Sequence, residues 1–196
     1  MNIKTLIGLG VVALLVFFGI SKYNSLVEEQ QQVNQSWAQV ENQYQRRADL
    51  IPNLVNTVKG AADFEQQTLT DVIEARSKAS SIQVSADDLN NPQKVQQFQQ
   101  AQQQLSGALS RLLVTVEKYP ELKANQNFRD LQTQLEGTEN RIATERQRFN
   151  ESVQNYNTMV QRFPNNVFAG LFGFDQKAYF EADEGASEAP EVNFNN

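Results

Sequence analysis

The chain has 196 residues, a net charge of −6, and neither cysteine nor histidine. This length fits one domain, and the missing residue types exclude Cys–His and Ser–His–Asp catalysis, zinc sites built on thiolate or imidazole, and disulfides. Carboxylates, lysines and hydroxyls could still carry chemistry, so enzymes are disfavoured but not excluded. Because no basic patch with interleaved aromatic residues is present, we expect no nucleic-acid partner.

The first predicted element is a membrane anchor at residues 1–21. No charged residue occurs in 5–21, and its 17 residues would span about 26 Å as a helix, the short end of a bilayer crossing. A cleaved signal peptide and a buried core helix are the alternatives, but the cleavage site before residue 22 is weak. Lys4 precedes the stretch and Lys22 follows it, so the positive-inside rule favours a body outside the cytoplasm only slightly. We expect a single-pass membrane protein with an extracytoplasmic body.

Four long helices are predicted beyond the anchor, at about 22–48, 50–81, 92–119 and 121–162. In each, apolar residues recur at heptad-like steps of three and four, and no stretch alternates as a strand does. Pro52 suits a helix start or forces a kink, and Pro92 suits a first helical turn. Pro120 and Pro164 each stop a helix at the residue before them. The rows of the first helix are Leu26, Val33 and Val40 with Trp37, Tyr44 and Ile51, and that of the fourth is Phe128, Leu135, Ile142, Phe149, Tyr156 and Phe163.

These patterns predict an all-α fold. Short, proline-marked connections favour antiparallel packing at small crossing angles. We therefore expect an N-terminal transmembrane helix followed by an antiparallel bundle of about four long helices with heptad-like seams, the bundle occupying residues 22–164. Heptads alone do not decide whether the seams are satisfied within one chain, so a homo-oligomer remains open.

Carboxylates interrupt the predicted seams at Glu65 and Glu145, with Glu139 nearby in the sequence. Such groups could bind a hard cation or share a proton. Arg76 and Arg141 offer the other interpretation, in which Glu–Arg pairs fix helix register, since a buried carboxylate needs a partner, or the carboxylates are simply exposed ends of the seam. We favour the pairs, because di-metal sites in bundles use Glu-x-x-His pairs and this chain has no histidine. We expect no catalytic residue, no metal and no cofactor.

A charged cluster of Arg46, Arg47 and Asp49 stands just before Pro52. It could clamp an anionic headgroup or a partner's carboxylate. More often such a cluster marks the place where one helix ends and the next begins, and we favour this interpretation. About 25 helical residues, roughly 37 Å, separate Arg46 from the predicted span, so contact with lipid would require the helix to fold back.

An apolar run at 167–174, which includes Phe172 and Phe174, lies outside the predicted helices. It could enter a membrane interface and remodel the membrane, or receive a partner. We favour a segment, 165–180, that folds back over one end of the bundle. The final stretch, 181–196, carries five acidic residues and no basic one, and is predicted to be disordered. The rest of the chain is therefore nearly neutral, and the net charge says little about partners.

Taken in order, these segments resemble the LemA family of bacterial membrane proteins. The matching motifs extend from Tyr23 to Phe180. They include Trp37 with Val40, the run 46–55 with Arg46, Arg47, Asp49 and Pro52, Lys59 with Gly60, Glu65, Arg76, the run 119–124, the run 136–142 with Glu139 and Arg141, Phe163 with Pro164, and Phe172 with Phe174. The family's pattern usually has Tyr and His after the Lys-Gly pair, where this chain has Ala61 and Phe64. A site built on that histidine is therefore not expected here.

The resemblance implies a single-pass protein of the bacterial cell envelope with a helical body and no transferable catalytic residues. Relatives among magnetosome-membrane proteins imply work in a membrane assembly, and an association of members with membrane-bound proteases implies such a protease as one partner. We therefore expect a non-catalytic, membrane-anchored interaction or scaffold protein that binds the lipid bilayer and a membrane protein. The alternatives are a carboxylate-based enzyme or metal-binding bundle, and a protein that remodels membranes directly.

Overall fold

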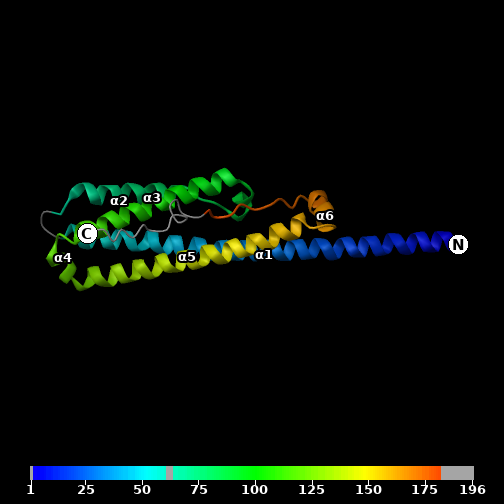
Figure 1. Ribbon diagram of the computed structural model, residues 1–196, viewed down its shortest axis with the longest axis horizontal. Coiled ribbons are helices and arrows are strands. Elements are labelled where there is room, and N and C mark those ends of the chain that lie inside the picture. Colours follow the sequence, from blue (N-terminus) through cyan, green and yellow to red (C-terminus); the bar gives the residue numbers. More distant parts are fainter. Residues whose placement is uncertain (1, 61–63, 182–196) are drawn as a thin grey trace, which may run out of the picture.

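The computed structural model describes residues 2–60 and 64–181 of the chain (Figure 1). Within these residues the helices are α1 (Ile3–Lys59), α2 (Gln66–Ser81), the short 3-10 helix η1 (Ala86–Asn90), α3 (Pro92–Val116), α4 (Pro120–Ala124), α5 (Gln126–Gln161) and α6 (Asn165–Phe172). No strand occurs in the described residues. The predicted all-α class is confirmed.

Four long helices build the bundle. Helices α1 and α5 run antiparallel, side by side, and α2 and α3 form a second antiparallel pair alongside them (Figure 1). The short α4 connects α3 to α5 at one end of the bundle, and α6 lies at the other end against α1 and α5. With 36 residues, α5 is about 54 Å long, so the bundle is a rod of roughly this length. The predicted antiparallel bundle is confirmed.

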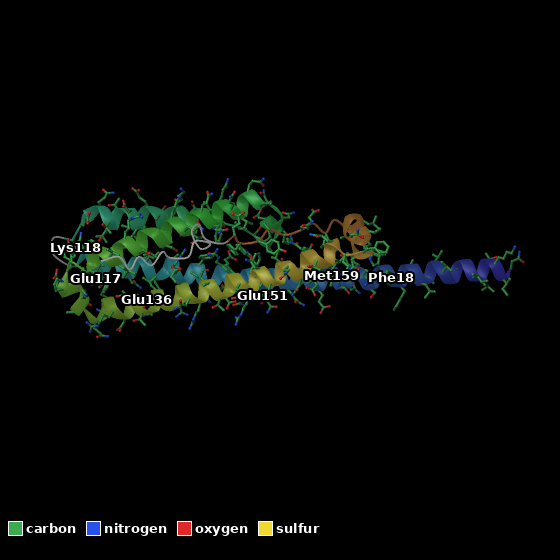
Figure 2. All side chains as sticks on the ribbon, in the orientation of Figure 1. Phe18, Glu117, Lys118, Glu136, Glu151 and Met159 are labelled. Atoms are coloured by element: carbon green, nitrogen blue, oxygen red, sulfur yellow. The ribbon has the colours of Figure 1, made fainter. Side chains whose placement is uncertain are left out.

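The N-terminal part of α1 extends beyond the bundle. Its large apolar side chains are exposed from Ile3 to Leu14 and from Val16 to Ile20, and Phe18 lies near the level at which the bundle begins (Figure 2). Among the described residues, α1 is the one helix that is long and apolar enough to cross a membrane. An exposed apolar surface of this extent is typical of a segment that lies in a bilayer.

The predicted boundary between the first and second helices is wrong, because α1 continues without interruption through Pro52. Leu54 and Val58, which we expected in the second helix, are buried in the last turns of α1. Proline has no backbone N–H, so the carbonyl four residues earlier, at Ala48, lacks its usual helical donor. The Nε of Arg76 donates to this oxygen at 2.8 Å. A side chain from α2 therefore satisfies the backbone of α1 across its proline.

Two further boundaries differ from the expectation, because α2 begins only at Gln66 and the predicted helix 121–162 is divided at Asn125 into α4 and α5. The caps and the prolines follow the sequence signals. Asn91 caps α3, its Oδ1 accepting from the backbone N–H of Lys94 at 3.2 Å, and Asn125 caps α5 in the same way. Helix α5 ends at Gln161, shortly before Pro164. Its heptad row is buried as far as Tyr156, but the last predicted member, Phe163, lies beyond the helix and is exposed.

Buried apolar side chains form two clusters, one toward each end of the bundle. The cluster near α4 joins the end of α1 to α2, α3 and the start of α5. The cluster near α6 joins the middle of α1 to the start of α3, the second half of α5 and the C-terminal segment. The first contains Ile51, Leu54, Leu69, Leu105, Leu112, Phe128 and Leu135, and the second contains Leu26, Val33, Trp37, Val40, Phe98, Phe149 and Tyr156.

After α5 the chain forms α6 and then an extended segment, 173–181, that turns back along the bundle (Figure 1). Most of the apolar run 167–174 is therefore helical, contrary to our expectation. Gly173 ends α6 with φ 75°, a left-handed conformation that glycine adopts without strain, and this lets the chain reverse. Residues 182–196, which were predicted to be disordered, and Ala61 lie outside the described part of the chain.

Candidate functional site

Arg47 is the largest of the fully buried side chains, with 1% of its surface exposed. It lies in the last third of α1, seven residues after Val40 and seven before Leu54, on the apolar row of that helix. A guanidinium in such a place needs partners, because burial of an unpaired charge costs several kcal/mol. The helices packed on α1 supply them.

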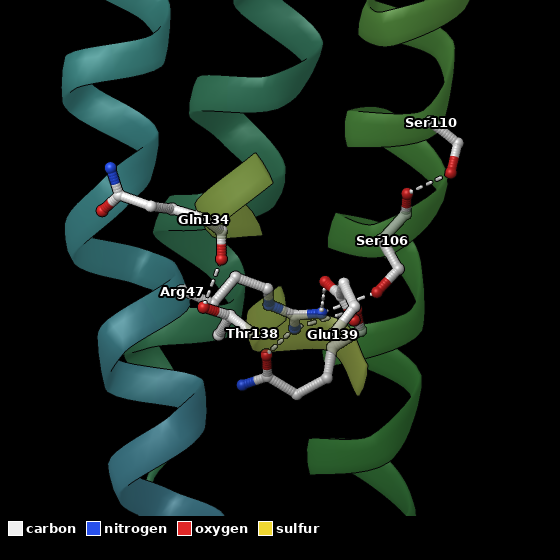
Figure 3. A network of polar contacts seen from close by, with 7 residues as sticks. Arg47, Ser106, Ser110, Gln134, Thr138 and Glu139 are labelled. Atoms are coloured by element: carbon white, nitrogen blue, oxygen red, sulfur yellow. Dashed lines mark hydrogen bonds and ion pairs between the residues drawn. The ribbon is translucent and has the colours of Figure 1, made fainter. Parts of the chain in front are cut away.

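The partners of Arg47 come from α3 and α5 (Figure 3). Its Nη1 donates to Glu139 Oε1 at 2.8 Å and to Ser106 Oγ at 2.7 Å. Its Nη2 donates to Gln102 Oε1 at 2.5 Å. The guanidinium also lies over the ring of Tyr44, 5.1 Å from its centroid, a favourable cation–π contact. Three helices are thereby joined at one side chain.

We call the residues around this guanidinium the polar layer: Arg47, Gln102, Ser106, Thr138 and Glu139. It lies between the two apolar clusters, and its members interrupt the apolar rows of α1, α3 and α5 at the same level (Figure 3). Hydrogen bonds of this geometry form in only one register of the three helices. The polar layer therefore fixes how the helices align.

A surface hollow of about 300 Å³ opens beside the polar layer, with Tyr44, Gln99, Gln103 and Arg146 among its lining residues. The terminal nitrogens of Arg47 already donate to side chains of this chain, and its Nε has no acceptor. Nη2 also donates to the backbone oxygen of Gln102, so both terminal nitrogens are engaged within this chain, and the Nε atom is buried. The arrangement joins α1, α3 and α5 through one buried side chain.

The predicted charged cluster around Arg47 divides into buried and exposed members. Arg46 and Asp49 are exposed on the surface of α1, where they line a shallow hollow. All three residues lie in the middle of a helix, so the interpretation of the cluster as a helix end is wrong. Arg47 does clamp a carboxylate, but it is that of Glu139 in the same chain.

The other predicted charged residues are not gathered at one place. Glu65 is exposed and precedes α2, outside the apolar seam in which we expected it. Glu145 pairs with Arg148 at 2.8 Å, whereas Arg141 is exposed. Lys59 is exposed in the last turn of α1. In the described part of the chain, no three or more acidic residues are grouped so as to hold a metal ion.

Trp37 lies in an aromatic cluster in the half of the bundle nearer α6. Its ring contacts Phe98 and Phe149 edge-on, with centroids 5.6 and 5.4 Å away, and stacks on Phe180 at 5.8 Å. Its indole N–H donates to Val84 O at 3.0 Å, so its polar atom is satisfied in the core. Trp37 thus packs α1 against α3, α5 and the C-terminal segment at once.

Three side-chain amides hold the extended segment, and we call Gln99, Asn150 and Asn157 the amide clamp. Asn157 Nδ2 donates to Lys177 O at 2.9 Å, and its Oδ1 accepts from Lys177 N at 2.8 Å. The same reciprocal pair of bonds joins Asn150 to Phe180 and Gln99 to Glu181. Each side-chain amide thus donates to and accepts from one backbone residue, as a neighbouring β-strand would. This clamp was not predicted from the sequence, although Asn150 and Asn157 are spaced by seven residues and follow the aromatic residues Phe149 and Tyr156 in motifs that resemble those of the family.

Two ionisable groups beside the clamp have shifted pKa values. Burial raises the pKa of Tyr156 to about 12, and the carboxylate of Asp175 adds to the rise. The hydroxyl of Tyr156 donates to the backbone oxygen of Asp175 at 3.0 Å. Burial lowers the pKa of Lys177, although Asp87 and Asp175 oppose that change. Tyr156 is therefore a neutral donor that fastens the extended segment at physiological pH.

The predicted pair Phe172 and Phe174 lies where the apolar stretch of α1 enters the bundle. Both rings contact that of Tyr23, with centroids 5.1 and 5.7 Å away. One turn further toward the N-terminus, the ring of Phe168 lies 5.9 Å from that of Phe18. Helix α6 is therefore packed on the same turns of α1 that lead out of the bundle.

The sequence from residue 36 to residue 194 matches the LemA family. The chain belongs to the LemA family. The resemblance inferred from its motifs is thereby confirmed, and the matched region contains the polar layer, the aromatic cluster and the amide clamp. At one of the two positions where this chain departs from the LemA pattern, Phe64 is buried and packs against the ring of Tyr119, 4.9 Å away.

The relatives include proteins with two different names. Protein LemA of Metamycoplasma hominis is 22% identical to this chain, over 88% of this chain and 75% of the relative. Magnetosome protein MamQ 2 of Paramagnetospirillum magneticum and magnetosome protein MamQ of Magnetospirillum gryphiswaldense are each 24% identical, over 96% of this chain and 75% of the relative. The similarity to the MamQ proteins thus extends over nearly the whole chain.

Proposed function

We propose that this LemA-family protein is a membrane-anchored helical scaffold, which holds its bundle at the surface of a bacterial membrane and assists a membrane assembly. The observation that carries the proposal is the unbroken course of α1 from the exposed apolar stretch into the core of the bundle. The 57 residues of α1 span about 85 Å. Anchor and bundle therefore form one stiff element, unlike a soluble domain tethered by a linker.

The proposed role is non-catalytic. In support, the carboxylates considered from the sequence have separate surroundings: Glu139 lies on Arg47, Glu145 on Arg148, and Glu65 in solvent. The buried guanidinium of Arg47 is engaged by Glu139, Gln102 and Ser106. The names of the MamQ relatives place those proteins at the magnetosome, which supports work within an assembly.

The proposed partners are the lipid bilayer and a membrane protein. Two candidates for that membrane protein are a membrane-bound protease and a second copy of this chain. The proposed position of the body is outside the cytoplasm. A rod of about 54 Å offers its partners a long side surface at a defined distance from the membrane.

The anchor is tested by placing charge in the exposed apolar stretch. Changing Val12→Lys together with Val16→Lys costs about 2.5–3.5 kcal/mol for each lysine at the centre of a bilayer. We expect the wild-type chain to remain in the membrane pellet after an alkaline carbonate wash and the double variant to be released. Ile73→Lys with Val114→Lys, at exposed apolar positions on α2 and α3, is the matched control and should stay in the pellet. Release of the wild-type chain by the wash would disprove the anchor.

The scaffold role is tested by crosslinking in intact membranes followed by mass spectrometry. We expect a membrane protein to be linked reproducibly to surface residues of the bundle, and the link to be lost in the Val12→Lys, Val16→Lys variant.

The position of the body is tested with a single cysteine at Val114, since the native chain contains none. Its reaction with a membrane-impermeant maleimide in intact cells is expected, and protection until lysis would place the body in the cytoplasm.

A further inference from the structure

Helix α6 leaves a row of large apolar side chains uncovered. Val167 and Leu171 are 59% and 73% exposed, and Phe163, just before the helix, is exposed as well. Val167 and Leu171 are four residues apart, so they lie on one face of α6. The opposite face is buried on the bundle through Asn165 and Ala169. The uncovered face is therefore a fixed outer surface of the molecule.

This face lies beside the last turns of the proposed span. Phe168 of α6 lies 5.9 Å, ring to ring, from Phe18, and a methyl group added at Gly19 would lie 3.4 Å from it. Phe172 packs on Tyr23, and the Lys22 ammonium lies 5.2 Å from the ring of Phe18. Lysine and tyrosine at this position are typical of the boundary between hydrocarbon and headgroups.

The length of the apolar stretch also supports a boundary between hydrocarbon and headgroups at the level of α6. Residues 5–21 would span about 26 Å, whereas the hydrocarbon core of a bilayer is about 30 Å thick. Hydrocarbon that covers the whole stretch exceeds it by a few ångströms, and the part of this excess on the side of the bundle lies at the level of α6. The structure places α6 there, alongside Phe18 and Gly19.

The extended segment keeps α6 at this level. Immediately after α6, the backbone of Asp175 accepts from Tyr156 and that of Lys177 is held by Asn157 in the amide clamp. Helix α6 is thus tied to the bundle on one side and packed on α1 on the other. Its apolar face therefore stays exposed beside the span instead of packing in the core.

We infer that α6 is an interfacial helix that inserts Val167 and Leu171 into the boundary layer of the bilayer, beside the point at which α1 enters it. The occupant of the uncovered face is the lipid of the membrane that holds α1, because the face is continuous with the apolar surface of the span. The anchor and α6 then form two adjacent contacts that set the orientation of the bundle. The inference rests on the proposed membrane anchor.

The test uses the full chain with single cysteines, since the native sequence has none. Leu171→Cys reports α6, Leu14→Cys reports the middle of the span, and Val114→Cys is the control, at a 67% exposed apolar position. Val114 lies just before Glu117 and Lys118, at the end of the bundle away from α6 (Figure 2). Each variant is labelled with an environment-sensitive fluorophore and reconstituted in vesicles of phosphatidylcholine and phosphatidylglycerol.

Quenchers attached along the lipid acyl chains and an aqueous quencher measure the depth of each label. We expect the Leu171 label to be quenched by lipid at a shallow depth, the Leu14 label at a greater depth, and the Val114 label only from water. A Leu14 label quenched from water would overturn the anchor and the inference together. A deep Leu14 label with a Leu171 label quenched from water, or protected from both quenchers by a second copy or another protein, would overturn the inference alone.

Discussion

At the scale of single residues, Arg47 shows how a buried charge can organise a bundle. It is fully enclosed, whereas its ionic partner Glu139 is 41% exposed. Loss of one member of a buried ion pair costs about 3–5 kcal/mol, but a partner open to water contributes far less. The neutral acceptors Gln102 and Ser106 therefore matter as much as the carboxylate, because they share the enclosed side of the guanidinium.

We expect Arg47→Ala to lower the free energy of unfolding by about 3–5 kcal/mol, since it leaves a cavity and removes the donor to Gln102 and Ser106. Glu139→Gln should cost only about 1 kcal/mol, because the amide oxygen can still accept. Urea unfolding of the detergent-solubilised chain, followed by circular dichroism, measures both. Arg46→Ala, one residue away and exposed, is the control and should change stability by no more than about 0.5 kcal/mol. A cost for Arg47→Ala as small as for the control would contradict the proposed alignment role.

Tyr156 gives a prediction for alkaline pH. Its pKa is raised in the folded chain to about 12, mainly by burial, whereas the unfolded phenol ionises near pH 10. The native state therefore holds its proton where the unfolded state releases it. The contribution of this proton to stability is full below pH 10 and is lost as the pH rises from 10 to 12.

The comparison of wild type with Tyr156→Phe isolates this effect, because all other titrating groups are shared. We expect the advantage of the wild-type chain in unfolding free energy to shrink as the pH rises from about 9 toward 12. Chemical unfolding at closely spaced pH values measures the difference. An advantage that stays constant over this interval would show that the phenol ionises equally in both states.

The position of Arg47 could have been predicted from the sequence, since the row Leu26, Val33, Val40 reaches residue 47 at its next step. Gln102 is likewise the one polar member of an otherwise apolar row in α3. What the sequence could not supply is the vertical alignment of α1 and α3. That alignment decides whether the polar residues of the two rows meet each other or face apolar neighbours. It depends on loop lengths and on packing along the whole bundle.

At the scale of elements, α1 shows why helix boundaries are harder to predict than helical rows. Proline removes a donor and disfavours the helix interior by about 3 kcal/mol, so a boundary at Pro52 was the local expectation. The carbonyl of Ala48 finds its donor in Arg76 on another helix. Tertiary contacts of this kind override local preference and leave no local signal. The amide clamp is similar, because it joins α5 to a segment that reaches it only through the turn at Gly173.

A double-mutant cycle tests the link between Pro52 and Arg76. In the wild-type chain, Arg76→Ala should cost about 1–3 kcal/mol, because the partly buried Ala48 oxygen loses its charged donor. In a Pro52→Ala background the restored backbone N–H can serve that oxygen, so the same change should cost clearly less. Equal costs in the two backgrounds would show that Arg76 acts independently of the proline. Lys78→Ala, at an exposed position on the same helix, should be without effect in both backgrounds.

At the scale of the whole molecule, the anchor, α6 and the bundle form one body. Helix α1 runs from the anchor, past α6, into the bundle, and α6 is tied both to α1 and, through the amide clamp, to α5. Because the apolar stretch is about 4 Å shorter than an average hydrocarbon core, its position must respond to the thickness of the bilayer. A stiff connection transmits that response to α6, whereas a hinge after the span would absorb it.

We therefore expect the Leu171 label to move deeper as the bilayer thickens. In lipids whose hydrocarbon core is thinner than about 26 Å, α6 should lie among the headgroups, and in cores thicker than about 30 Å its face should enter the acyl region. Quenching of the Leu171 label by acyl-chain quenchers, measured over a series of acyl lengths, reports this movement. The Leu14 label should stay deep and the Val114 label should stay in water throughout. A Leu171 depth that is independent of thickness would show that span and bundle are uncoupled, and the scaffold would then lack the fixed orientation that the unbroken α1 gives it.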